Sequence, residues 1–540
     1  MSQKSSFLLG FAALFLATAI LGLWAAYDQK VAFLRFAFLA IGGIAVVVAG
    51  TLGRQQRMQF APYAAWGGSL LAGAVAVYYL ATRQGGHDAF GGITGSALAI
   101  LLPFPLANLL RTLRNKQWPW VLLSVLLVLV GGVGLFATRE RGAMLSLLAG
   151  GAMALLFWLL VEQNVQASSV RLIRWLIWSL GLLALIGYGL FVIMPSVASQ
   201  VGAMLHLHPD SDILGRRELW NNAIALMSDY PFTGSGLGSV PMALASYVYI
   251  SHVANQPHVH NLLLQVGTEQ GWLGALAMAG MLVLAVMVAM EALPAHTRDL
   301  QELRLASIAS TITLFVYGLL DAELYAYSTV PLTFAPIAFA LLVRSSPRHQ
   351  SRRERKERNE LRYMTWAGIG LALIAVGIWL NGAKLRSALF ANLAAIDQSK
   401  AELSVYNYQI WGVQDRLRRK PDGVNLDATE RYFQIALVID AQNESALRRS
   451  GQIALAQGDY DKAGQMLQSA YQLAPEHRAN RQLLGEALAV RGQIDEAAQL
   501  WQSVSFLDSQ LEGRAWWYEQ LQELQAAKNI HLAMAKIAKQ

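Results

Sequence analysis

Hydrophobic and polar positions divide the chain into two parts. Through the first two-thirds, apolar runs of about 20 residues recur between short polar segments, and each is long enough to cross a hydrocarbon core. Such runs must be helical in lipid, because no water is present there to satisfy the backbone. The pattern predicts about eleven spans, with ends uncertain by a few residues. They lie at 6–27, 31–52, 60–82, 89–110, 118–137, 142–162, 172–194, 261–290, 304–322, 325–343 and 363–381.

Composition agrees with a membrane protein. Of the 540 residues, 55% are hydrophobic and only 14% are charged, whereas a soluble globular chain is about 25% charged. Cysteine is absent, which excludes disulfides, thiolate catalysis and any zinc site built on cysteine. The formal net charge is +8, but the basic residues gather in short segments between spans. We therefore expect no nucleic-acid partner.

Lysine and arginine in these short segments predict the orientation, because cytoplasmic loops carry an excess of both. A cytoplasmic N-terminus puts most of them inside. The inside residues are Lys4, Arg54, Arg57, Arg111, Arg114, Lys116, Arg171, Arg174, Arg298, Arg304, Arg344, Arg348, Arg352, Arg353, Arg355, Lys356, Arg358 and Arg362; the outside residues are Lys30, Arg83, Arg139, Arg141, Arg216 and Arg217. The basic run at 344–362 then faces lipid headgroups. Residues 195–260 and 382–540 are expected on the other side of the membrane.

The last third of the chain contains a repeat. Gln, Glu, Asp, Ala and Arg become frequent after Asn381, and a pattern returns after 34 residues. The recurring positions are Gly451, Gly458 and Ala463 in one copy and Gly485, Gly492 and Ala497 in the next. This resembles tetratricopeptide repeats, with copies at 444–477 and 478–511 and flanking helices at 425–441 and 513–538. Stacked helical pairs form concave partner surfaces, so we expect a protein partner here or, alternatively, a packing cap on the membrane part.

The segment 195–260 is too polar for a span and too long for a simple connector. A helix is predicted from about Gly215 to Asp229-Tyr230-Pro231. The following Gly234-Ser235-Gly236-Leu237-Gly238 lacks the Lys-Ser/Thr of a phosphate-binding loop. It is either a tight turn or a cradle for an anionic oxygen.

His260 ends this segment beside a span, where a neutral imidazole could accept a proton from a hydroxyl near pH 7. Asp321 and Glu323 are alternative bases in a later outer loop. The neighbouring histidines are His206, His208, His252 and His258. No acidic ligand accompanies them at a recognisable spacing, so we expect no metal.

The sequence His260-Asn261, nine residues, then Gly271-Trp272-Leu273-Gly274 resembles the signature of O-antigen ligases and Wzy-type polymerases. Upstream, Gly215-Arg216, Trp220, Pro231 and the glycine series resemble the outer loop of the same family. The segment from Thr138 to Ala143 resembles a further family segment, but Glu140 stands where serine is common. The resemblance covers roughly residues 85–345.

This resemblance implies an all-α, GT-C-like polytopic bundle with four parts. These are N-terminal spans at 1–194, a catalytic loop at 195–260, C-terminal spans at 261–381 and the repeat domain at 382–540. It also implies a glycosyltransferase in the bacterial inner membrane, which moves a glycan from undecaprenyl diphosphate to an acceptor hydroxyl on the periplasmic face. The acceptor would be lipid A-core, a second lipid-linked repeat or an exported protein. No cofactor is expected.

The resemblance, together with the chemistry of each side chain, assigns roles to particular residues. His260 and Arg216 are the expected catalytic residues. One guanidinium group can donate two parallel hydrogen bonds to phosphate oxygens. We therefore expect Arg141, Arg217 and Arg139 to bind the diphosphate. Asn261, Gly271 and Trp220 are expected to support the site.

Two other functions compete with the enzyme. A transporter of lipid-linked glycans would place charged residues inside the bundle, and the spans read as nearly free of internal charge. A membrane-anchored scaffold would need far fewer spans.

Overall fold

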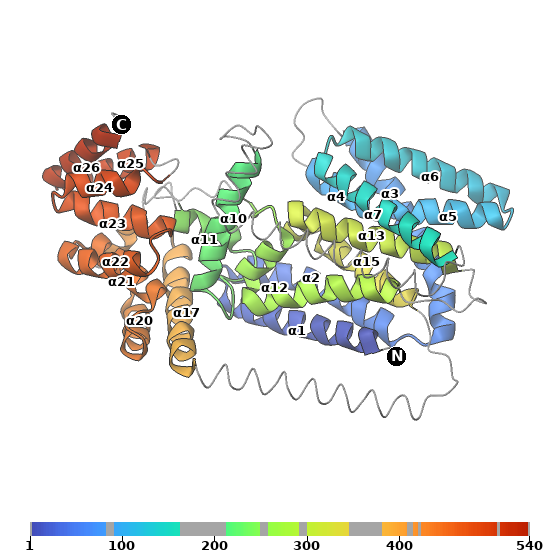
Figure 1. Cartoon of the computed structure of the whole chain (residues 1–540), viewed down its shortest axis with the longest axis horizontal. Helices are drawn as coiled ribbons and strands as arrows, with labels where there is room; N and C mark the ends of the chain where they lie inside the picture. The colour runs from blue at the N-terminus through green and yellow to red at the C-terminus, as the bar shows by residue number, and fades with distance from the viewer. Residues whose placement is uncertain are drawn as a thin grey trace.

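The computed structural model describes residues 3–82, 91–162, 212–248, 257–290, 300–344, 381–407, 414–419, 423–504 and 508–537. Every regular element in these ranges is a helix. The predicted all-α fold is therefore confirmed. Figure 1 shows a bundle of long helices and, at one end of it, a stack of short helices.

The long helices lie side by side in the bundle (Figure 1). They are α1 (Gln3–Ala25), α2 (Gln29–Thr51), α3 (Arg54–Thr82), α4 (Gly91–Leu101), α5 (Pro103–Arg114), α6 (Trp118–Ala137), α7 (Arg141–Glu162), α12 (Leu262–Ala289) and α13 (Gln301–Leu320), followed by the short α14 (Glu323–Ala326) and α15 (Val330–Leu342). Helix α1 packs along α12, α2 along α15, and α7 along α13.

Among the described residues, eight helical stretches are long and apolar enough to cross a membrane, with α4 and α5 together forming one, and α15 is a shorter apolar helix. The chain is thus a multi-pass membrane protein. The predicted spans at 172–194 and 363–381, and the basic run beyond Arg344, lie outside the described residues. The count of eleven and the orientation stay predictions.

Small residues line the contacts between these helices. Helix α3 turns Ala65, Ala72 and Ala76 inward, where each is fully buried, whereas α6 exposes Leu122 and Phe136. This pattern suits lipid, because the hydrocarbon provides no hydrophobic driving force and helices associate through close packing of small residues.

The spans were expected to be nearly free of internal charge, and the structure places a buried ion pair among them. Arg35 of α2 and Glu269 of α12 form a buried ion pair at 3.4 Å. Gln265 donates to the same carboxylate at 2.9 Å, and the Arg35 guanidinium lies 4.7 Å from the centre of the Tyr325 ring. The mean hydropathy of each span stays high, because each of these charged residues has mostly apolar neighbours along the chain.

Helix α12 is broken beside this pair. Gly271 has a φ of 76° and a ψ of −179° inside the helix. A side chain there would come within 3.0 Å of the backbone of Pro231 and Phe232, and the amide of Trp272 donates to the Pro231 carbonyl at 3.0 Å. The break therefore lets the preceding loop pack into the bundle, and only glycine fits the backbone conformation without strain.

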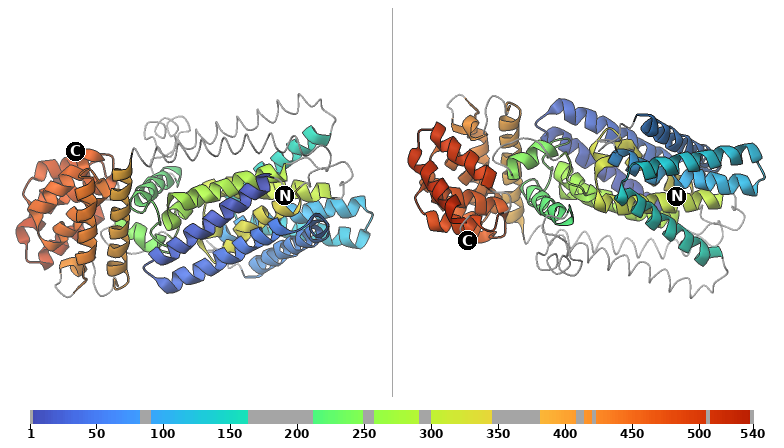
Figure 2. Two further views of the ribbon diagram at one scale, coloured as in Figure 1. Left: turned by 90° about the horizontal axis from the view of Figure 1, so that it is seen from below. Right: turned by 90° about the horizontal axis from the view of Figure 1, so that it is seen from above.

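Two helices of the loop, α10 (Asp212–Asp229) and α11 (Val240–Val248), lie between the bundle and the C-terminal helices. The C-terminal helices are α17 (Gly382–Leu403), α19 (Asp415–Arg419), α20 (Asp427–Ile439), α21 (Glu444–Gln457), α22 (Tyr460–Leu473), α23 (Arg478–Val490), α24 (Ile494–Trp501), α25 (Asp508–Gln520) and α26 (Leu524–Ile537). Figure 2 shows α17 between the loop helices and the repeats.

The predicted repeats appear as the helix pairs α21–α22 and α23–α24. Gly458 ends α21 with a φ of 91°, and Asp459 then caps α22 by accepting from the Lys462 amide. Gly492 takes a φ of 87° at the equivalent turn. At Gly485 a side chain would overlap the Trp501 ring, so this glycine allows α23 and α24 to approach closely.

We predict that Glu269→Gln destabilises the protein by about 3–5 kcal/mol, because Arg35 is then left buried without its counter-charge. Thermal unfolding of the purified protein in detergent measures this. The control is Glu476→Gln, which removes a carboxylate that is 83% exposed in its ion pair with Arg481 and should cost at most about 1 kcal/mol. Equal small losses for both variants would contradict the account.

Candidate active site

A single carboxylate organises the end of the bundle that faces α10. Asp321 follows the last residue of α13 and is 5% exposed. Its Oδ1 accepts from the amides of Ala322 and Glu323, at 2.7 and 3.2 Å, which holds the turn into α14. His258 Nε2 lies 3.0 Å from Oδ1, and His260 Nδ1 lies 2.8 Å from Oδ2. Asp321 therefore joins the loop to the bundle.

The two histidine rings are in contact, with their centres 4.2 Å apart and their planes tilted by 57°. His260 has a φ of 49°, a left-handed conformation that is uncommon outside glycine and often occurs at functional sites. Asn261 fixes this turn: its side chain caps α12 by accepting from the Leu264 amide at 3.0 Å. The backbone thus aims His260 at Asp321.

This contact selects the tautomer of His260. An ionised carboxylate can only accept hydrogen bonds, so His260 Nδ1 must carry the proton. His260 Nε2 is then the nitrogen that could accept a proton from a substrate hydroxyl. The His260 side chain is 24% exposed, whereas that of His258 is only 3% exposed. His260 is therefore the histidine that a substrate can reach.

Arg216 of α10 reaches the same place. Its Nη1 donates to the Leu320 carbonyl at 2.7 Å, and its Nη2 lies 3.7 Å from Asp321 Oδ2. The side chain is 36% exposed. A guanidinium has five N–H donors, so Arg216 can hold the end of α13 and still present donors to an anionic substrate.

The charge of Asp321 is stabilised by these contacts. Burial raises the pKa of the Asp321 carboxyl, but the hydrogen bonds from His258 and His260 outweigh burial and hold the pKa well below its ordinary value. Asp321 is therefore ionised throughout the neutral range.

Two further carboxyl groups lie near Asp321, and their pKa values are raised rather than lowered. Burial, followed by the charges of Asp321 and Glu140, raises the pKa of Glu323 to about 8. Burial and the Asp321 charge also raise the pKa of Glu140. Both pack on α4, where a side chain at Gly92 would overlap the Glu323 carboxylate. Glu323 is thus largely a neutral carboxylic acid at pH 7.

Comparison with known families agrees with this geometry. Residues 125–279 match the family model described as O-antigen ligase. Residues 454–516 match a tetratricopeptide repeat family. No curated protein matched the chain. The first match includes Arg216 and His260, so the resemblance inferred from the sequence is confirmed over residues 125–279.

The remaining arginines predicted to bind the diphosphate are not brought to Asp321. Arg139 and Arg141 are exposed on either side of Glu140, and the contacts of the described residues join neither to His260 or Arg216. Arg139 has a φ of 57°. Arg217 is half-buried, and burial lowers its pKa. Their diphosphate-binding roles stay predictions.

The predicted supporting residues shape the backbone of the site. Asn261 caps α12, and Gly271 forms the break in it. Trp220 is 4% exposed on α10, where its neighbours Ala223 and Leu226 pack against Ala25 at the end of α1. These contacts hold the helix that carries Arg216 against the bundle.

The glycine series is a packed turn, which was the first of its two sequence interpretations. Gly234, Gly236 and Gly238 all have positive φ, and a side chain at Gly236 would overlap the backbone of Ala26. The backbone amides are used within the protein: Ser235 donates to Thr268 and Leu237 to Gly22. These two amides are therefore bonded within the protein and are not available to a substrate anion.

His258, His260 and Asp321 could together ligate a cation, since their ligand atoms lie within 4.8 Å of one another. We expected no metal from the sequence, because Asp321 is remote from the histidines along the chain and no acidic ligand lies close to them. His206, His208 and His252 lie outside the described residues. Arg216 competes for the same Asp321 oxygen, and its positive charge disfavours a metal ion there.

We predict that Glu323 controls the alkaline limit of activity. Its pKa of about 8 means that raising the pH adds a negative charge beside Asp321, which would repel an anionic donor. Activity of the wild type at pH 9 should fall to about one-tenth of its value at pH 7, since about nine-tenths of a group with this pKa is then ionised.

Glu323→Gln should lose this alkaline decline, and Glu476→Gln, a distant exposed control, should retain it. Transfer rates measured from pH 6 to pH 9.5 give the comparison. Superimposable profiles for wild type and Glu323→Gln would contradict the assignment.

Proposed function

We propose that the chain is a metal-independent glycosyltransferase that moves a glycan from undecaprenyl diphosphate to an acceptor hydroxyl on the periplasmic face of the bacterial inner membrane. The observation that carries the proposal is the contact of His260 and Arg216 with one carboxylate, Asp321. A base and a cationic group are thereby held together where the bundle meets the loop. Such a pair suits transfer of a group from a diphosphate.

The reaction follows from these positions. The acceptor hydroxyl oxygen attacks the anomeric carbon of the donor, and the bond from this carbon to the diphosphate oxygen breaks. His260 Nε2 takes the hydroxyl proton as the new glycosidic bond forms. Asp321 stabilises the resulting imidazolium through Nδ1, as a positioning residue that does not touch the substrate. A single displacement of this kind inverts the anomeric configuration.

The leaving diphosphate needs positive charge, which Arg216 supplies through the donors not used on the Leu320 carbonyl. Donors held in place before reaction stabilise the developing charge without reorganisation. Arg141 and Arg139 are exposed beside Glu140 and could bind the diphosphate as the donor enters, with Arg217 as a further candidate. A neutral Glu323 keeps additional negative charge away from this group.

The acceptor defines three forms of the activity. A ligase would use lipid A-core, a polymerase a second lipid-linked repeat, and an oligosaccharyltransferase a Ser or Thr of an exported protein. The family match, described as O-antigen ligase, favours the ligase. The repeat match is compatible with each of them.

A lipid-linked glycan transporter is the second candidate, because the Arg35–Glu269 pair and the break at Gly271 are features that transporters place at substrate sites. The pair is fully engaged within the protein, however, by Gln265 and Tyr325. Charges partnered in this way tie helices together, so we favour the enzyme.

We predict that His260→Ala lowers product formation by about 10²–10⁴-fold through loss of the base. Arg216→Ala should lower it by about 10²–10³-fold through loss of a charge-stabilising donor. The assay complements a strain lacking the protein, at matched membrane levels, and separates glycolipids, exopolysaccharide and exported glycoproteins on gels. The missing product then identifies the acceptor.

His531→Ala and Arg491→Ala are matched controls on the repeat domain, where both side chains are well exposed, and should form product normally. Lipid-linked donor should accumulate on the periplasmic face in the two active-site variants. Accumulation on the cytoplasmic face would instead support the transporter, and normal product in both variants would reject the site.

Metal independence is tested by chelation. We predict that membranes treated with EDTA and washed retain the full transfer rate, because Arg216 and the hydrogen bonds from the two histidines already occupy the Asp321 oxygens. A loss of activity that Zn²⁺ or Mn²⁺ restores would contradict this and assign the His258, His260 and Asp321 group to a metal ion.

A further inference from the structure

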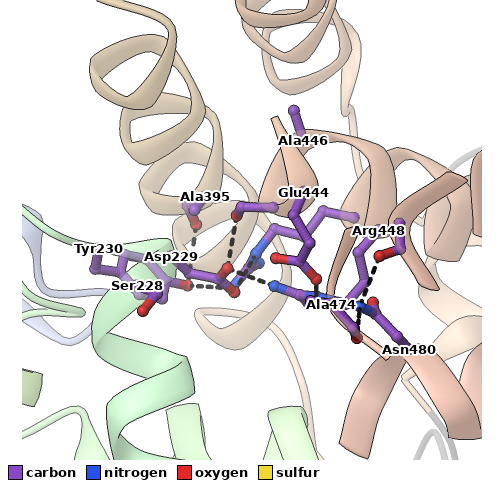
Figure 3. A network of polar contacts seen from close by, with 12 residues as sticks. Ser228, Asp229, Tyr230, Ala395, Glu444, Ala446, Arg448, Ala474 and Asn480 are labelled. Carbon is purple, nitrogen blue, oxygen red and sulfur yellow. Dashed lines mark hydrogen bonds and ion pairs between the residues drawn. The ribbon is translucent and has the colours of Figure 1, made fainter. Parts of the chain in front are cut away.

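The helix that carries Arg216 is held from outside the membrane bundle. Helix α10 begins near the bundle and ends at Asp229, against the repeat domain. Figure 3 shows Asp229 entering a polar network formed by side chains of the C-terminal helices, with Arg448 and Glu444 on α21. Asp229 is 1% exposed, so this contact is an interior one.

Two arginines and a serine of α21 hold the Asp229 carboxylate. Arg449 Nε donates to Oδ2 at 2.9 Å, Arg448 donates to Oδ1, and the Ser445 hydroxyl donates to Oδ1 at 2.6 Å. Burial raises the pKa of Asp229, but the two guanidinium groups outweigh it and hold the pKa far below its ordinary value. The carboxylate is thus ionised and fully matched.

Arg449 also connects to α17. Arg449 Nη1 donates to Gln398 Oε1 at 2.8 Å, and its Nη2 donates to the Tyr230 hydroxyl at 3.0 Å. The Tyr230 hydroxyl in turn lies 2.6 Å from the Ser399 hydroxyl. The end of α10 is therefore enclosed by α17 on one side and α21 on the other.

A second contact joins α10, near its first turns, to the repeat domain. Glu218, two residues after Arg216, forms an ion pair with Arg478 at the start of α23. Glu218 and Asp229 are eleven residues apart, which is about 16 Å along a helix. Two contacts this far apart fix both the direction of α10 and its rotation about its own axis.

The repeat domain holds part of its own chain, the end of α10. Tyr230 of the loop, with Arg448 and Arg449, lines a polar cavity of about 60 Å³ between α17 and the repeats. The arginine Arg418 in this cavity is also paired, with Glu402. The charges around the loop are thus matched within the chain.

We propose that the C-terminal repeat domain positions the catalytic helix: the Asp229 contact with Arg448 and Arg449, together with the Glu218–Arg478 pair, sets α10 so that Arg216 reaches Asp321. This inference rests on the proposed function. Arg448, Arg449 and Arg478 are positioning residues that act through α10 and touch no substrate. The domain is on this account part of the active site, with the loop of its own chain as its partner.

The first test is a double-mutant cycle in the transfer assay. Arg448→Gln/Arg449→Gln should lower kcat by about 10²-fold, as expected for a misplaced charge-stabilising group. In the Arg216→Ala background the same change should lower kcat by less than threefold, because the group being positioned is gone. The control Arg481→Gln/Arg491→Gln, in the same domain but away from α10, should have no effect in either background.

Equal losses in the two backgrounds would overturn the positioning role and leave the proposed function intact. If Arg216→Ala and His260→Ala themselves have no effect, the proposed function has failed instead. The two failures are therefore distinguishable.

The second test keeps the proposal falsifiable if the double variant does not fold. The chain has no cysteine, so Glu218→Cys/Arg478→Cys carries the only two thiols. Because long side chains separate these backbones beyond the reach of a direct disulfide, a short bis-methanethiosulfonate linker joins them. Activity should be low before linking, return towards wild type on linking, and fall again when a reductant releases the linker.

The same treatment should leave the cysteine-free wild type unchanged. A linked protein that stays as inactive as the unlinked one, while it elutes as a folded species in detergent, would overturn the proposal.

Discussion

The site depends on one buried carboxylate that several parts of the chain share. Asp321 closes α13, starts α14, receives both histidines of the loop and lies 3.7 Å from Arg216. A buried charge with incomplete partners is costly. Contacts from the loop and from α10 offset this cost, and the folded state therefore favours both segments in place at Asp321. The same contacts that satisfy Asp321 select the tautomer of His260. The stability of this corner of the fold and its chemistry thus follow from a single requirement.

Buried ion pairs lie at two places where the loop meets another part of the molecule. Arg35 and Glu269 join α2 to α12 just where α12 breaks to admit the loop. Asp229 and the α21 arginines join the loop to the repeats. Charge pairs are directional and fail when geometry is wrong, whereas small-residue packing tolerates sliding. We infer that the apolar bundle provides the frame and that the charged contacts fix the orientation of the loop within it.

The sequence was sufficient for the helical class, the repeat units and the family resemblance, because each has a periodic or local pattern. Gly458 and Gly492 marked their turns, and the end of α10 at Asp229 was predicted from Tyr230-Pro231. The partners of His260 were harder to find, since Asp321 is 61 residues away and was only an alternative base. Glu140 was interpreted only as a departure from the family pattern. In the structure it is close enough to Asp321 for the Asp321 charge to help raise the pKa of Glu140. The Arg35–Glu269 pair was missed because apolar neighbours surround both charges.

The most direct test of this account is the rate of glycan transfer by the purified protein in liposomes, with an undecaprenyl-diphosphate-linked donor and a defined acceptor, for wild type and Asp321→Asn. The Asn side chain is neutral and has one accepting oxygen in place of two. His260 Nδ1 should therefore no longer be held in its protonated form, and the imidazolium should lose its stabilising charge. The account predicts a transfer rate lower by about 10²-fold or more, with donor binding largely retained through Arg216. A wild-type rate for Asp321→Asn would contradict the claim that this carboxylate organises the site.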